Sequence, residues 1–339
     1  MYTFTNTEIN NKKASEFETK SLLYLIGMRR DSNEIDIITI DCFNDVTGAN
    51  KEFIKLWDVQ SKNHKNLPPS KIGESLLTLY NNFISNIDFS EYILFIPKLK
   101  RDYLVNASLN IYGYSNINQK QKNGIEKKLI EKINNTELNK SFLLMDFLGS
   151  VTFVEDNKKI STYIKKIAQF KNKKVVPEDL YKSIFNDIRN AQTALKNSYI
   201  ENETINKPIE VLKFNRHITK AEINTLLVSR LVGVDVFSFP GIPFPFLSVV
   251  KEFDNETAKD LIQDCNENLS RAFFDKNGCK NFWKVSEFII LYLKENPEEN
   301  IHNVLDALQR ALSITTLYLT NNTILYMISL VKTGLDNDN

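Results

Sequence analysis

The chain has 339 residues, 42% hydrophobic and 25% charged, an ordinary globular composition that excludes a disordered, collagen-like or coiled-coil protein. Its 43 basic and 42 acidic residues leave a net charge of +1, so any site for a polyanion must be a local patch. With only 10 Gly and 9 Pro, the sequence favours long helices over a many-stranded sandwich or barrel, and its length suggests roughly two domains.

The cysteines and the apolar segments indicate where such a protein would reside. Cys42, Cys265 and Cys279 form no C-x-x-C pair and have no matching His spacing, so neither a disulfide framework nor a zinc site is expected. The first residues lack the basic and apolar regions of a signal peptide. Polar residues interrupt the apolar window 311–331, which argues against a membrane span. We therefore expect a cytoplasmic protein with no membrane segment.

The first part of the chain alternates between helix and strand patterns. Apolar and small residues recur with helical spacing over 11–30, and a β-branched run at 35–43 predicts a strand that leads into a turn or strand edge at 44–48. Strands separated by helical crossovers predict a mixed or parallel sheet flanked by helices. The other elements expected here are strands at 53–62, 92–96 and 141–154 and helices at 72–87, 161–170 and 177–198.

The strand signal fades after residue 200, where only a short strand at 210–214 is expected. Thr219 and Glu222 match the capping box that opens a helix, which we expect to run to residue 231. A Pro-rich aromatic segment follows at 234–246. Helices are then expected at 256–274, 281–294, 297–313 and 315–331. The sequence thus predicts an α/β domain over residues 1–210 and a mainly α-helical domain over residues 211–339.

Several enzyme classes lack their usual signatures in this sequence. It contains no P-loop, no dinucleotide-binding glycine motif, no H-E-x-x-H and no G-x-S-x-G. The three histidines, His64, His217 and His302, are too scattered to suggest a multi-histidine metal site. ATP hydrolysis by this chain is not expected.

Polar residues in the strand at 53–62 suggest a site. Alternation places Asp58, Gln60 and Lys62 on one face, whereas a strand buried between helices normally carries apolar residues on both faces. An edge strand with one wet face is the alternative explanation, and alternation alone favours it. Asp45 begins the preceding strand region, where either a metal-binding carboxylate or an Asx-turn fits the sequence.

Glu18 lies on the same helical stripe as apolar residues. Burial of an unpaired carboxylate is costly, so Glu18 needs a cation, a metal or a hydrogen-bonding partner unless it lies at the water line of the helix.

Together, Glu18, Asp45, Gln60 and Lys62 resemble the PD-(D/E)xK nuclease pattern: a helix Glu, an Asp at the start of a strand, and an acidic-or-Gln, any residue, Lys triplet. The version with Gln resembles the N-terminal double-stranded DNA endonuclease domain of bacterial antiphage effectors of the CBASS and Lamassu types. The resemblance covers about the first 100 residues well and implies a restriction-endonuclease-like fold. Asp58, Asp36 or Asp41 could substitute as a ligand if the strand register differs.

The resemblance implies hydrolysis of DNA phosphodiester bonds with Mg²⁺ or Mn²⁺. Glu18, Asp45 and the Gln60 amide oxygen would hold the cation, since hard cations prefer oxygen ligands, and Lys62 would orient the nucleophile and offset charge. DNA would lie on a local basic surface, first at Lys98, Lys100 and Arg101. Other basic clusters are Lys120, Lys122, Lys127 and Lys128, and Lys165, Lys166, Lys171, Lys173 and Lys174.

The helical half is expected to serve assembly or control. Its last three helices carry more apolar residues than three amphipathic stripes need, so we expect a homo- or hetero-oligomer, with a closed helical bundle as the alternative. The Lamassu-type resemblance implies an SMC-like ATPase partner, whereas the CBASS-type resemblance implies a cyclic-oligonucleotide ligand. The competing functional hypothesis is a non-catalytic interaction module that recruits partner proteins.

Overall fold

The computed structural model describes residues 1–4, 15–64, 67–134, 143–172, 175–197, 199–275, 278–314 and 316–337. The chain divides into two compact units. The first contains Met1–Tyr163 and Phe185–Lys220, and the second contains Ile164–Ile184 and Ala221–Asn339. The expected boundary at residue 210 therefore differs in two respects: residues 164–184 belong to the second unit, and residues 211–220 stay with the first.

The first unit is built on a seven-stranded mixed sheet with the strand order β6-β7-β5-β4-β3-β2-β9. Strands β2, β3 and β4 form an antiparallel meander, β5 and β7 run parallel to β4, and β6 and β9 are antiparallel to their neighbours. The expected α/β class with a mixed sheet is confirmed. The strands of the sheet are β2 Ile37–Ile40, β3 Val46–Ala49, β4 Leu56–Ser61, β5 Glu91–Pro97, β6 Ile111–Gly113, β7 Val151–Asp156 and β9 His217–Thr219. A separate pair joins β1 Tyr2–Thr3 to β8 Thr204–Ile205.

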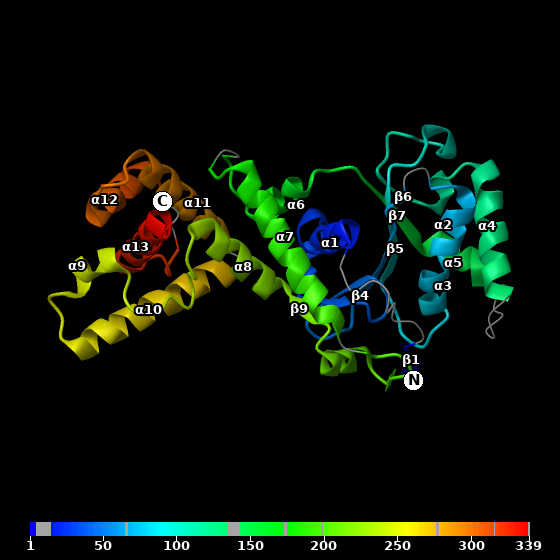
Figure 1. The fold of residues 1–339 in the computed structure, drawn as a ribbon, viewed down its shortest axis with the longest axis horizontal. Helices are drawn as coiled ribbons and strands as arrows, with labels where there is room; N and C mark the ends of the chain where they lie inside the picture. The colour runs from blue at the N-terminus through cyan, green and yellow to red at the C-terminus, as the bar shows by residue number, and fades with distance from the viewer. Residues whose placement is uncertain are drawn as a thin grey trace. The chain divides into compact units, whose positions relative to one another are not determined.

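Helices cover both faces of this sheet. In Figure 1, α2, α3, α4 and α5 lie on one side of the strands and α1 lies on the other. Leu94 and Ile96 of β5 pack in the core formed with α2–α5, whereas Phe95 places its ring 5.0 Å from that of Phe17 on α1. A strand buried on both faces requires an almost continuous apolar sequence, which explains the run in β5. These helices are α1 Glu16–Leu23, continued by a π-helical turn at Tyr24–Met28, α2 Pro69–Ser75, α3 Leu77–Phe83, α4 Gln119–Asn134 and α5 Leu144–Ser150.

The described part of the second unit contains helices and no strand, so the expected helical C-terminal region is confirmed. Its aromatic core includes Phe273, whose ring lies 4.8 Å from that of Phe282 and 5.9 Å from that of Trp283. Most apolar residues that we expected a second chain to cover are buried within the chain itself, although Leu317 is 91% exposed. The helices are α8 Lys220–Val232, α9 Leu247–Val250, α10 Asn255–Phe274, α11 Cys279–Glu295, α12 Ile301–Ala311 and α13 Asn321–Asn337.

Two further helices, α6 Ile160–Ile167 and α7 Glu178–Ala194, contribute residues to both units. Within the described residues, no helix combines the length and apolar character that crossing a lipid bilayer requires.

Three expected elements differ from the structure in type or in bounds. Residues 144–150 form α5 rather than strand, because Leu144, Phe147 and Leu148 are buried at helical spacing while Met145 is 61% exposed. The strand expected at 210–214 is instead the 3₁₀ turn Pro208–Phe214. Its last ring, Phe214, packs against Phe4 at 5.5 Å. The last helix begins at residue 321, six positions later than expected.

Parts of some expected elements lie outside the described residues: 11–14 of the first helix, 141–142 of the expected strand, and Ser198 and Thr315 at helix ends. Lys173 and Lys174 of one basic cluster also lie outside them.

Candidate active site at the end of the sheet

A cavity of about 100 Å³ in the first unit gathers the four residues singled out in the sequence, Glu18, Asp45, Gln60 and Lys62. It lies where β4 ends. Lys62 follows the last residue of that strand, and Glu18 comes from α1. The remaining lining residues are Asp41, Cys42, Phe43 and Asn44 of the β2–β3 loop, Thr78 of α3 and Lys196, just after α7.

Two larger cavities have few side chains that are available for catalysis or metal binding. One, of about 550 Å³, lies between α2 and α4 and is lined by charges that already pair, such as Lys71 with Glu74 and Lys128 with Glu131. The other, of about 570 Å³, runs along α10 and has mainly apolar and amide side chains. The small cavity is therefore the strongest candidate for a reactive site.

The hairpin register brings Asp45 to Gln60. Val46 of β3 pairs with Val59 of β4, so the residue before one lies opposite the residue after the other. Gln60 Nε2 donates to Asp45 Oδ2 at 2.6 Å, and Ser61 donates to the same oxygen through its backbone N at 2.8 Å and its Oγ at 3.0 Å. The Asp45 carboxylate reaches across to β4, so it does not close an Asx-turn. Ser61 was not anticipated from the sequence.

Strand β4 is not an edge strand, because β3 and β5 flank it and all six of its residues are buried. Its polar residues therefore lie in the protein interior and do not form a solvent-exposed face of an edge strand. Asp58 is fully buried and accepts from Asn82 Nδ2 at 2.7 Å, Thr47 Oγ1 at 3.3 Å and Asn44 Nδ2 at 3.4 Å.

Burial raises the pKa of Asp58 to about 7, although the hydrogen bonds from Asn82, Asn44 and Thr47 act in the opposite direction. Asp58 does not line the cavity. Neither does Asp36, which instead accepts from the backbone N of Lys51 at 3.0 Å.

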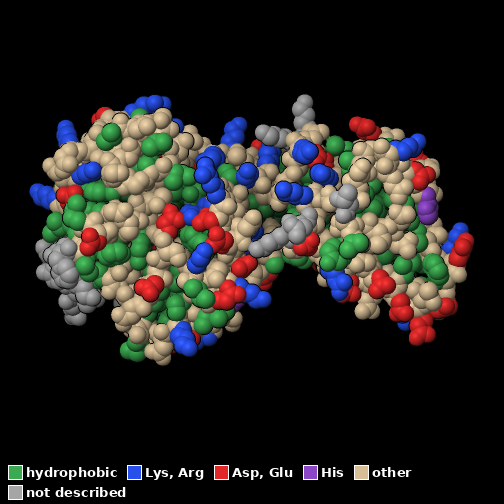
Figure 2. All heavy atoms as spheres, turned by 180° about the vertical axis from the view of Figure 1, so that it is seen from behind, with side chains coloured by type: hydrophobic (Ala, Val, Ile, Leu, Met, Phe, Trp, Pro, Cys, Tyr) green, Lys and Arg blue, Asp and Glu red, His purple; other side chains and the backbone are tan. Residues whose placement is uncertain are grey.

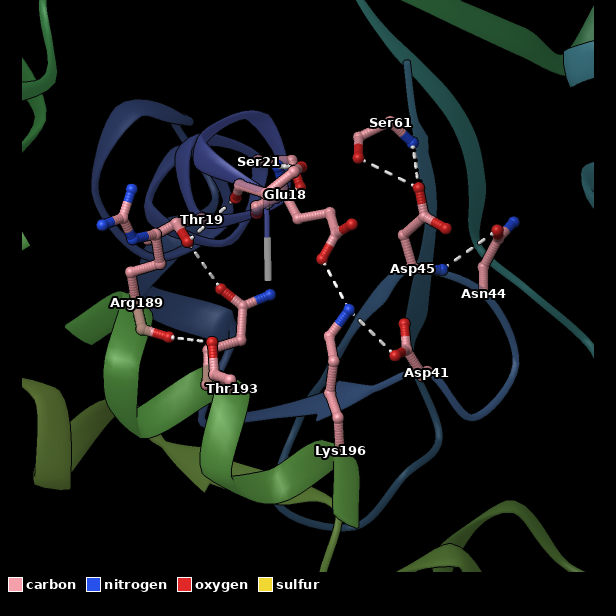
Figure 3. Close-up of polar contacts among 12 residues, drawn as sticks. Glu18, Thr19, Ser21, Asp41, Asn44, Asp45, Ser61, Arg189, Thr193 and Lys196 are labelled. Carbon is pink, nitrogen blue, oxygen red and sulfur yellow. Dashed lines mark hydrogen bonds and ion pairs between the residues drawn. The ribbon is translucent and has the colours of Figure 1, made fainter. Parts of the chain in front are cut away.

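Glu18 has the cationic partner that its buried position requires. Lys196 Nζ lies 2.7 Å from Glu18 Oε2 and 2.9 Å from Asp41 Oδ2, and its side chain is 5% exposed. Figure 3 shows the two carboxylates converging on this ammonium from α1 and from the β2–β3 loop. Lys196 was missed in the sequence because it lies 178 residues after Glu18. Asp41 was named only as a substitute ligand.

The β2–β3 loop holds Asp41 in a left-handed backbone conformation with φ of 48°, which Asp tolerates better than most residues. Its neighbour Cys42 is an unsuitable nucleophile or metal ligand, since burial raises the pKa of the thiol to about 12 and keeps it protonated.

Charge in the cavity is unevenly compensated, with Glu18, Asp41 and Asp45 facing the ammonium groups of Lys62 and Lys196. Burial raises the pKa of Asp45 to about 6, the charge of Lys62 opposes this, and Glu18 adds to it. For Lys196, burial lowers the pKa, but Asp41 and Glu18 outweigh it, so the net pKa is raised. A further cation would relieve the repulsion that remains among the three carboxylates.

The donor set fits a hard divalent cation. Asp45 Oδ1 and Gln60 Oε1 accept no hydrogen bond from another described residue, so both remain available as oxygen ligands. Glu18 offers a third oxygen. The described residues nevertheless contain no ready group of three His, Cys, Asp or Glu side chains around one point. The expected donor set contains only two residues of these types, Glu18 and Asp45, because its third ligand is the amide oxygen of Gln60.

Comparisons with protein-family models, with curated proteins and with solved structures found no match for this chain.

Proposed function

We propose that this chain is a divalent-metal-dependent DNA endonuclease that hydrolyses phosphodiester bonds. The observation that carries the proposal is the cavity that gathers Glu18, Asp45, Gln60 and Lys62 at one end of the sheet. The elements that carry the four residues support the proposal. Glu18 lies on α1, Asp45 precedes β3, and Gln60 and Lys62 lie at the end of β4, and the PD-(D/E)xK pattern expects its Glu, Asp and closing triplet on elements of these kinds.

The residues divide the work by their chemistry. Glu18, Asp45 and the Gln60 amide oxygen would hold Mg²⁺ or Mn²⁺, which when bound supplies Lewis-acid stabilisation of the charge that develops at phosphorus. Lys62 makes no ion pair with another described residue, yet its charge is felt at Asp45. Its ammonium is thus available to orient the attacking water and to offset negative charge on the phosphate.

Basic residues that follow β5 offer a surface for the DNA backbone. Strands β4 and β5 are parallel, with Ser61 opposite Phe95, so Lys62 and the residues after β5 leave the sheet at the same edge. Lys98, Lys100 and Arg101 follow there and are exposed. On the face in Figure 2, acidic and basic side chains are intermixed, which agrees with a local rather than a global attraction for DNA. Replacing these three residues with Ala should flatten the salt dependence of DNA binding by roughly one logarithmic slope unit per lost phosphate contact.

A DNA-cleaving enzyme in the cytoplasm requires control, and the helical unit is the part of the chain available for it. We propose that the protein acts as an effector of bacterial antiphage defence whose activity depends on assembly, with an SMC-like ATPase as the favoured partner. The apolar side chains of α11–α13 are mostly buried within the chain itself. A contact with a partner would therefore use exposed apolar residues such as Phe244 and Leu317.

One observation favours the competing function of a non-catalytic interaction module: Lys196 already neutralises Glu18 and Asp41 without a metal. Incubation of supercoiled plasmid with the full-length protein and Mn²⁺, alone and with the proteins encoded beside it, separates the two functions. Cleavage that disappears in EDTA and in Lys62→Ala supports the nuclease. Cleavage by the Lys62→Ala protein at the wild-type rate would show that this site does not cleave DNA and supports the interaction module. Absence of cleavage by the wild-type protein under every condition also supports it.

A further inference from the structure

Lys196 is the most enclosed member of the ion-paired cluster that it forms with Glu18 and Asp41. Its side chain is 5% exposed, that of Glu18 is 12% exposed and that of Asp41 is 21% exposed. A buried ammonium between two carboxylates occupies the kind of position that a metal cation would take, since both satisfy the same oxygens. Hydrogen bonds from other parts of the fold decide whether Lys196 is held in this position.

Contacts around the cavity fix the backbone segment that carries Lys196. Arg216 is buried and donates through Nη1 to the backbone O of Asp41 at 2.8 Å and through Nη2 to the backbone O of Lys196 at 3.4 Å. On the other side, Thr19 Oγ1 of α1 donates to Gln192 Oε1 of α7 at 2.8 Å. The bonds from Arg216 hold the segment after α7 against the β2–β3 loop, and the bond from Thr19, which is drawn in Figure 3, holds α7 against the helix that carries Glu18.

Lys196 and the proposed metal site use the same carboxylate. Glu18 Oε2 accepts from Lys196 at 2.7 Å, so a divalent cation that takes Glu18 as a ligand must share or displace this ammonium. Like charges at such short range repel strongly in a partly desolvated site.

We propose that Lys196 is a positioning residue of the active site: it holds Glu18 and Asp41 together in the metal-free protein and competes with the incoming divalent cation. This inference rests on the proposed function, because it presumes that Glu18 is a metal ligand. When the cation takes Glu18, Lys196 remains paired with Asp41 and stays beside the reaction site.

The experiment is calorimetric titration of Mn²⁺ into the full-length wild-type protein, Lys196→Met and Lys196→Gln, together with their melting temperatures in EDTA and in Mn²⁺. Lys196→Gln keeps a hydrogen-bonding group without the charge, so it remains informative if the Met variant folds poorly. Lys20→Met is the matched control. Lys20 is 9% exposed and lies 3.1 Å from Glu16 and 3.6 Å from Asp156, but it does not line the cavity.

Both Lys196 variants should bind Mn²⁺ on the order of tenfold more tightly than wild type, because a competing charge is removed. In EDTA, both Lys196 variants should melt at a lower temperature than wild type. Mn²⁺ should raise the melting temperature of the Lys196 variants by more than it raises that of Lys20→Met. The Mn²⁺ affinity of Lys20→Met should equal that of wild type. Equal or weaker Mn²⁺ binding by the Lys196 variants, with a wild type that binds, would overturn the role of Lys196 alone. Absence of Mn²⁺ binding in all the proteins would overturn the metal site and the proposed function together.

Discussion

Replacing Asp45 with Asn should stabilise the metal-free protein at neutral pH. Burial is the main reason that the pKa of this carboxyl rises from 3.8 to about 6. Because each pKa unit corresponds to about 1.4 kcal/mol, the ionised form costs the folded state up to about 3 kcal/mol. Asn can keep its side-chain oxygen where Oδ2 accepts from Gln60 and Ser61, so the substitution removes the charge and retains the hydrogen bonds.

The sign of the pH dependence follows from the raised pKa. Between about pH 4 and pH 6 the folded protein holds a proton that the unfolded chain has lost, so stability falls as the pH rises through that window. The cost is complete above pH 6. Asp45→Asn carries no such cost, and its advantage over wild type should be small at pH 4 and greatest near pH 8.

Urea unfolding of wild type and Asp45→Asn in EDTA at both pH values measures this difference, because the other titrating groups are common to both proteins. Asp45→Ala is the control, since it also removes the charge but leaves Gln60 and Ser61 without their acceptor. Added Mn²⁺ should stabilise wild type at pH 8 and not Asp45→Asn. If Asp45→Asn is less stable than wild type at pH 8, or if the difference in unfolding free energy is the same at both pH values, burial of the Asp45 charge does not destabilise the folded protein.

Two further substitutions test the framework around the site. A Cβ at Gly73 would lie 2.4 Å from a backbone carbonyl of α4, so Gly73→Ala should lower the melting temperature by several degrees, whereas Gly149→Ala, with open space around its Cβ, should be neutral or stabilising by up to about 1 kcal/mol. Asn82→Ala removes the shortest hydrogen bond to buried Asp58, and urea unfolding should show a loss of about 1–3 kcal/mol at pH 8 that shrinks as Asp58 protonates below pH 7. An Asn82→Ala protein as stable as wild type at pH 8 would contradict this interpretation of Asp58.

Local patterns in the sequence were sufficient to predict that the polar residues near β4 belong to one site. Asp45 and Gln60 lie on adjacent strands of one hairpin meander, so a short stretch of sequence contains both and their register follows from the alternation of side chains. Glu18 could also be singled out, because its place on an apolar stripe requires a partner. The identity of that partner could not be derived, since Lys196 comes from a segment that only the tertiary fold brings back to α1.

The misassigned elements each have a physical cause that the local sequence pattern does not show. Residues 141–154 are a short apolar run, which fits a buried strand and a buried helix equally well, and only the packing of Phe147 against Tyr80 and Phe83 decides for helix in α5. Residues 208–214 fold as a 3₁₀ turn, in which side chains three apart share a side, so Val211 and Phe214 reach the same small core. Asp41 was likewise obscured, because its left-handed backbone is set by the loop as a whole.

Diffraction from crystals of the full-length protein soaked in Mn²⁺, recorded at the manganese absorption edge, tests the cation site most directly. We predict one anomalous peak in the small cavity, at bonding distance from Asp45 Oδ1, the Gln60 amide oxygen and Glu18, with Lys196 withdrawn from Glu18. Manganese found only on surface carboxylates, with Lys196 still between Glu18 and Asp41, would contradict it.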